Sequence, residues 1–119
     1  MIERLPERLL RLEGLAVAAG ALVLYFDAGY GWLVLVLLIL APDLSALGYL
    51  AGPRIGALTY DLAHTYAGPV ALGVAGVLAG SGTATQLALV WLAHIGVDRM
   101  IGYGLKYPTG FRDTHLQRV

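Results

Sequence analysis

The sequence contains no cysteine and few charged residues, and both scarcities exclude classes of function. Without cysteine, the 119-residue chain can form no disulfide, thiolate zinc site, iron–sulfur cluster or cysteine nucleophile. Any bound metal must therefore have oxygen and nitrogen ligands. Charged residues make up only 13% of the chain and the net charge is zero, so we expect no nucleic-acid partner. The sequence also lacks the Walker, dinucleotide-binding, G-x-S-x-G and H-E-x-x-H motifs.

Apolar residues are abundant instead. They make up 58% of the chain, more than the small core of a soluble domain of this length can bury. Four apolar stretches, joined by short connections that contain glycine or proline, are each long enough to cross a bilayer. They cover residues 9–26, 31–50, 55–79 and 83–105. The sequence predicts a single all-α transmembrane domain, an up-down four-helix bundle with a tail over 106–119. A soluble bundle of very apolar helices is the alternative.

The basic residues predict the orientation of this bundle. Seven of the eight precede or begin the first stretch, lie between the second and third, or follow the fourth: Arg4, Arg8, Arg11, Arg54, Lys106, Arg112 and Arg118. The other two connections, 27–30 and 80–82, contain no lysine or arginine. The positive-inside rule then places both termini in the cytoplasm. We therefore expect a multi-pass protein of the inner (cytoplasmic) membrane, with the lipid bilayer as its main partner.

Small residues recur along two of the stretches. Gly48, Gly52 and Gly56 are spaced four residues apart, and Gly73 and Gly76 lie in the third stretch. Glycine lets helix backbones approach closely in a membrane. The pattern predicts either packing within the bundle or a homodimer formed through these helix faces.

Six acidic or histidine side chains lie within the apolar stretches, where charge is costly and marks function by default. They are Glu13, Asp43, Asp61, His64, His94 and Asp98. In antiparallel helices all six fall in one layer near the cytoplasmic side. Asp61 and His64 are three residues apart, and His94 and Asp98 are four apart, so each pair shares a helix face.

This layer is typical of a metal centre in a helix bundle, to which two helices give one carboxylate each and two give a carboxylate–histidine pair. Glu13 and Asp43 are the single carboxylates. A divalent ion (zinc, manganese or iron) would offset the repulsion among the carboxylates. Glu13 or Asp61 is the candidate general base or a further ligand. Three alternatives stay open: Glu13 can pair with Arg11, Asp61 can pair with Arg54 or Arg99, and the whole layer can be a hydrogen-bond network.

Residues near the cytoplasmic end are candidates for binding substrate. Tyr103, Lys106 and Arg112 can hold an anionic group, and His115 can join the metal if the tail folds back. The alternatives are an aromatic belt that includes Tyr60 and Tyr103, and anchoring of the tail to anionic lipids.

Several motifs carry a resemblance to known families. Four motifs resemble those of an uncharacterised bacterial family of small four-helix membrane proteins, known as a domain of unknown function. They are the runs from Ala41 to Ser45, from Leu62 to Tyr66 and from Leu92 to Arg99, and the tail from Gly104 to His115. The resemblance covers residues 9–115 and implies no activity. A more distant likeness is to membrane-bound metal-dependent hydrolases, which share a Pro-Asp motif, then a histidine, then His-x-x-x-Asp. That likeness implies four metal ligands: Asp43, His64, His94 and Asp98.

Three functions follow from these observations. The first is a metal-dependent hydrolase that acts on a lipid-like or phosphoester substrate. The second is a proton or metal-ion relay. The third is a structural membrane protein in which the polar layer only holds the helices together.

Overall fold

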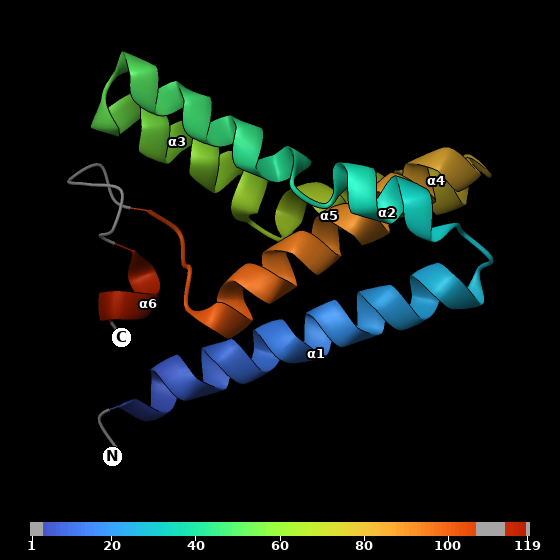
Figure 1. The fold of residues 1–119 in the computed structure, drawn as a ribbon, viewed down its shortest axis with the longest axis horizontal. Coiled ribbons are helices and arrows are strands. Elements are labelled where there is room, and N and C mark those ends of the chain that lie inside the picture. The colour runs from blue at the N-terminus through green and yellow to red at the C-terminus, as the bar shows by residue number, and fades with distance from the viewer. Residues whose placement is uncertain (1–3, 107–113, 119) are drawn as a thin grey trace.

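The computed structural model describes residues 4–106 and 114–118, and its regular elements are all helices (Figure 1). In chain order they are α1 (Leu5–Asp27), α2 (Trp32–Leu38), the 3₁₀ helix η2 (Ala41–Ala51), α3 (Pro53–His64), α4 (Ala67–Leu78), α5 (Gly82–Ile101) and α6 (His115–Arg118). The described residues form no β-strand, so the predicted all-α class is confirmed. Two helical stretches, Leu5–Asp27 and Trp32–Ala51, are long and apolar enough to cross a membrane.

The second and third predicted helices are each interrupted and are not continuous α-helices. The second changes from α2 to 3₁₀ geometry at Pro42, which has no N–H to continue an α-helix. The third breaks after His64, because Thr65 has an extended backbone (φ −93°, ψ 146°), and it resumes as α4. Both interruptions lie close to ionisable residues of the predicted layer.

Helix α5 is the central element, since it lies against both α1 and α4 (Figure 1). The crossing with α1 is very close because it joins glycines. A Cβ added to Gly96 would lie 2.6 Å from the backbone nitrogen of Ala18 and 2.7 Å from the carbonyl oxygen of Gly14. The small residues Gly14, Ala18 and Ala21 form the buried stripe of α1 that faces α5.

Helices η2 and α3 form a second antiparallel pair (Figure 1). Two of the glycines noted in the sequence serve this pairing, because a Cβ on Gly48 would collide with Thr59, and one on Gly56 would collide with Tyr49. The Thr59 hydroxyl donates a hydrogen bond to the Ser45 carbonyl across the pair (2.7 Å). These glycines therefore contribute to packing within one chain.

The chain folds back after α5 and closes one end of the molecule. Gly102 ends α5 in the left-handed conformation (φ 106°), which few other residues adopt without strain. The Leu105 carbonyl then accepts a hydrogen bond from the His115 backbone N–H (2.8 Å), and the side chain of Leu116 is fully buried. The short helix α6 thereby lies against α1.

The α1–α5 crossing predicts that alanine substitutions at two glycines change stability in different directions. We expect Gly96→Ala to lower stability by about 1–3 kcal/mol, because the added methyl meets backbone atoms that cannot move aside. Gly20→Ala, also in α1 but with open space around it, should be neutral or raise stability by up to about 1 kcal/mol. Thermal unfolding of both variants in detergent measures this, and equal stabilities would contradict the close crossing.

Candidate metal centre

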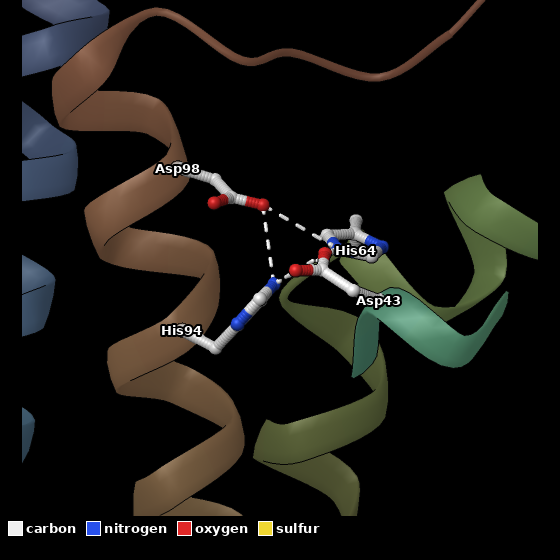
Figure 2. A group of neighbouring side chains, drawn as sticks. All are labelled: Asp43, His64, His94 and Asp98. Carbon is white, nitrogen blue, oxygen red and sulfur yellow. Dashed lines mark hydrogen bonds and ion pairs between the residues drawn. The ribbon is translucent and has the colours of Figure 1, made fainter. Parts of the chain in front are cut away.

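Four of the predicted residues meet at a single point (Figure 2). Asp43 comes from the first turn of η2, His64 from the last residue of α3, and His94 and Asp98 from successive turns of α5. One ligand atom from each side chain lies within 4.8 Å of all the others. Segments distant in the sequence thus direct their polar ends into one small volume.

The distances between these ligand atoms are short and nearly uniform. His64 Nε2 lies 3.1 Å from His94 Nε2, 3.2 Å from Asp43 Oδ1 and 3.4 Å from Asp98 Oδ2. His94 Nε2 lies 3.1 Å from the Asp43 oxygen and 3.2 Å from the Asp98 oxygen. A tetrahedral ion with bonds of about 2.0–2.1 Å separates its ligand atoms by about 3.3 Å. The spacing of each histidine nitrogen from the other ligand atoms is therefore close to what such an ion requires.

Backbone carbonyls determine the protonation of both imidazoles. His64 Nδ1 lies 2.8 Å from the carbonyl oxygen of Tyr60, and His94 Nδ1 lies 2.5 Å from that of Ile39. A carbonyl oxygen only accepts hydrogen bonds, so in each ring Nδ1 carries the proton. In the neutral imidazoles both Nε2 atoms then have lone pairs that point into the cluster. This arrangement is typical of histidines that bind metal through Nε2.

The helix interruptions make two carbonyls available for these side chains. In a continuous α-helix the Ile39 carbonyl would accept from the backbone N–H of Asp43. That N–H bonds instead to the Leu40 carbonyl (3.0 Å), which leaves the Ile39 carbonyl to His94. At the second break the His64 carbonyl accepts from Arg99 Nη2 (2.6 Å). Side chains of α5 thus donate hydrogen bonds to a backbone carbonyl at each helix interruption.

The cluster is rich in acceptors and poor in donors. Two imidazole lone pairs and two carboxylate oxygens face one another, and both histidines are almost fully buried. Four such atoms repel one another in a poorly solvated site unless a proton or a cation lies among them. This Asp43–His64–His94–Asp98 group, in which both histidines are buried, can hold a metal ion.

Tyr60 supports the cluster from one side. Its ring stacks on the His64 imidazole, with centroids 3.7 Å apart and planes 7° from parallel. Its hydroxyl lies within 3.4 Å of Asp98 Oδ2 and donates to it. The ammonium of Lys106 lies 4.4 Å from the centre of the same ring, a cation–π arrangement. Tyr60 therefore fixes the plane of one candidate ligand and the position of another.

A cavity of about 270 Å³ opens beside the two carboxylates. Its lining includes Asp43, Asp98, Tyr60 and Tyr103. Asp43 is about half exposed (49%), whereas His64 is inaccessible to solvent. A ligand that enters this cavity would therefore meet the carboxylate side of the cluster first.

The other predicted site residues lie away from the four ligand atoms. Asp61 Oδ1 accepts a hydrogen bond from the Lys106 backbone N–H (2.5 Å) and so fixes the start of the tail. Glu13 lines a different cavity. Lys106 is buried against Tyr60, and Arg112 lies outside the described residues. The catalytic and anion-binding roles predicted for these side chains stay predictions.

His115 does not reach the cluster either. Its Nδ1 accepts from the Leu105 backbone N–H (2.7 Å), and its ring lines the same cavity as Glu13. Burial, together with the positive charge of Arg99, lowers the pKa of His115 below its usual value. The ring is therefore neutral at pH 7 and suited to accept this hydrogen bond.

Sequence reasoning missed the groups that orient the candidate ligands. The carbonyls of Ile39 and Tyr60 and the guanidinium of Arg99 all act on the two histidines. Pro42 was a usable signal, since proline inside an apolar stretch marks a place where a helix changes its hydrogen bonding. Pro69 was a comparable signal for the break at Thr65, because a proline ring clashes with the carbonyl of the residue four positions earlier.

Comparison with known proteins establishes the family and nothing about activity. Residues 7–119 match the family model described as a domain of unknown function (DUF4260), and the chain belongs to that family. The predicted membership of an uncharacterised family is thereby confirmed. No curated protein and no solved structure matches the chain.

The acceptor-rich cluster predicts an unusual response to Asp98→Asn. The amide can donate a hydrogen bond to a histidine Nε2, so the metal-free variant should be as stable as the wild type or more stable by about 1 kcal/mol. Its metal content should fall at least tenfold, because a neutral amide is a poor ligand. Thermal unfolding and elemental analysis measure the two effects.

Asp27→Asn is the matched control, since Asp27 is exposed at the end of α1 and far from the cluster in sequence. It should change neither quantity. A metal-free Asp98→Asn protein that unfolds well below the wild type would identify the cluster as a hydrogen-bond network.

Proposed function

We propose that this chain is a multi-pass protein of the cytoplasmic membrane that binds one divalent metal ion through Asp43, His64, His94 and Asp98 and uses it to hydrolyse a lipid-like phosphoester. The observation that carries the proposal is the convergence of two imidazole lone pairs and two carboxylate oxygens at distances of 3.1–3.4 Å. Each imidazole is held in the metal-binding tautomer by a backbone carbonyl.

Zinc is the metal that this geometry favours. The 3.1–3.4 Å spacing around the two histidine nitrogens and the combination of two imidazoles with two carboxylates both suit zinc. Manganese and iron accept the same oxygen and nitrogen donors but usually bind more of them. The cavity beside Asp43 and Asp98 leaves room for a further ligand on that side.

Hydrolysis fits the side chains around this cavity. A divalent ion in such a site lowers the pKa of a bound water and polarises a phosphoester. Tyr103 is half exposed and lines the cavity, so its hydroxyl is placed to donate a hydrogen bond to substrate. Tyr60, through its hydrogen bond to Asp98, positions a ligand.

A second, apolar pocket supports a lipid-like substrate. It has a volume of about 360 Å³, and its lining includes Pro42 and Ala63, the residues that directly precede Asp43 and His64. Leu38, Leu72 and Trp91 complete an apolar wall. An acyl chain in this pocket would bring its linked polar group next to the candidate ligands.

The surface of the helices supports a membrane location. None of the residues of α2 or η2 is buried, although the segment is strongly apolar. Leu37 and Leu50, for example, are 69% and 88% exposed. A core helix of a soluble protein would be covered, whereas lipid accounts for an apolar helix that the protein leaves bare. The absence of lysine and arginine from the α1–α2 and α4–α5 turns agrees with the predicted orientation.

The cysteine-free sequence allows a direct test of topology. Single cysteines at Ala28→Cys, in the α1–α2 turn, and Arg54→Cys, at the start of α3, occupy exposed positions. In intact cells a membrane-impermeant maleimide should label the first and not the second, because the proposed orientation puts Arg54 in the cytoplasm. Both should react after the cells are lysed. Labelling of neither or both in intact cells, or of Arg54→Cys alone, would contradict the orientation.

Metal content and activity test the proposed function together. Purified protein should contain about one zinc per chain, and His64→Ala and His94→Ala should each lower zinc at least tenfold. In phospholipid nanodiscs the wild type should release a headgroup or phosphate product detectable by mass spectrometry. Both variants should lose this release at least a hundredfold, since each removes a ligand. Added zinc should not restore it.

His115→Ala is the matched control for metal content, because it removes the one histidine outside the cluster. It should retain its zinc. Stoichiometric manganese or iron would support the proposed metal site but show that its metal is not zinc. Metal-free wild-type protein would overturn the metal centre, and zinc-loaded protein without any released product would overturn the hydrolase. Zinc or proton flux in vesicles, lost in Asp98→Asn, would favour the relay in its place.

A further inference from the structure

A second polar cavity is lined in part by Arg99 and shares no lining residue with the cavity beside the metal ligands. It has a volume of about 250 Å³, equivalent to about eight water molecules at about 30 Å³ each. Its lining includes Glu13 from α1, Thr65 and Tyr66 from the break between α3 and α4, Arg99 from α5 and His115 from α6. None of the four candidate metal ligands lines it.

Arg99 brings a buried positive charge to this cavity. Its side chain is 5% exposed, and its guanidinium donates to two backbone carbonyls, those of Tyr103 (2.9 Å) and His64 (2.6 Å). Among the described residues no carboxylate forms an ion pair with it within 4.0 Å. Buried arginine is ordinarily paired with an anion, so its charge is open to an anionic ligand.

Tyr66 brings an unsatisfied donor to the same place. Its hydroxyl oxygen is buried and has no hydrogen-bond partner among the described residues. Arg99 Cζ lies 5.9 Å from the centre of the Tyr66 ring. Buried hydroxyls in folded proteins nearly always have a partner. A bound ligand in the cavity would supply it.

We propose that this cavity binds a phosphate ester, with Arg99 and the Tyr66 hydroxyl as donors to the phosphate oxygens. Arginine matches phosphate through its planar fork of N–H groups, and Thr65 adds a third possible donor at the wall. Glu13 is exposed and also lines the cavity. Its carboxylate suits a cationic group attached to the phosphate. Phosphoethanolamine has both a phosphate for Arg99 and an ammonium for Glu13.

Phosphoethanolamine reaches a membrane protein from two sources. One is the headgroup of phosphatidylethanolamine, and the other is a soluble phosphate ester. The chemistry recognised at the cavity is the same for both. The proposal does not rest on a bound metal, because none of the four side chains of the candidate metal centre lines this cavity.

Tyr66→Phe is the sharpest test, because it removes the hydroxyl and breaks no hydrogen bond seen among the described residues. With delipidated protein in detergent, calorimetric titration should detect phosphoethanolamine. With nanodiscs, native mass spectrometry should detect retained phosphatidylethanolamine. In whichever arm the wild type binds, Tyr66→Phe should weaken binding about tenfold, the equivalent of one hydrogen bond to a charged group. The ligand-free variant should unfold at or above the wild-type temperature.

Tyr30→Phe is the control, because its hydroxyl donates to the Gly82 carbonyl in the α4–α5 turn region and does not line the cavity. It should leave both affinities unchanged. Binding in the calorimetric arm identifies a soluble ester as a ligand, and binding in the nanodisc arm alone identifies the lipid headgroup. Absence of binding in both arms, or equal binding by wild type and Tyr66→Phe, would overturn the proposal whatever the metal content of the protein.

Discussion

The candidate metal centre depends on two hydrogen bonds from imidazole Nδ1–H groups to backbone carbonyls. The Tyr60 carbonyl holds His64 and the Ile39 carbonyl holds His94. Each bond fixes both the orientation of a ring and its tautomer, so that both Nε2 lone pairs point at the same place. Without these bonds each ring could rotate or move its proton to Nε2, and the neighbouring carboxylates would then accept from it in an ordinary polar network.

The helix interruptions are the structural source of this arrangement. In an apolar environment a broken helix leaves backbone groups that must find partners. Here α5, which has no break, supplies side chains to both interruptions, His94 to the Ile39 carbonyl and Arg99 to the His64 carbonyl. The same contacts that satisfy the backbone also set the positions of the candidate ligands. The hydrogen bonds that offset the free-energy cost of the helix interruptions therefore also determine the geometry of the site.

Much of the candidate site could be predicted from residue type and spacing. His94 and Asp98 are one helical turn apart, and one turn of α-helix is enough to place them together. Depth in the helices also indicated that Asp43 and His64 lie at the same level. The helical class follows equally well from the length of the apolar stretches, whereas α5 ends at Ile101 before Gly102, and the fourth stretch was predicted to continue to residue 105.

The positions of Glu13 and Asp61 could not be predicted in the same way. Glu13 has the expected depth, but α1 crosses α5 at the Gly14–Gly96 contact and directs Glu13 into the second cavity. Asp61 shares a face of α3 with His64 only approximately. It lies about one helical turn before His64, and at that level its carboxylate meets the Lys106 backbone N–H. Sequence spacing predicts how deep a side chain lies along its own helix and on which face of that helix it lies. It does not give the side of α5 on which each neighbouring helix packs.

Arg99 joins the two cavities through a single backbone group. Its guanidinium holds the carbonyl of His64, the residue whose imidazole faces the other candidate ligands, and it also lines the second cavity. An anion that draws the guanidinium outward would weaken its bond to this carbonyl, at the point where α3 ends and Thr65 becomes extended. A metal that fixes His64 would in turn hold that carbonyl in place for Arg99. Any energetic coupling between the sites has to be the same in both directions, and the 2.6 Å bond between Arg99 and the His64 carbonyl is the shortest physical route by which it can pass.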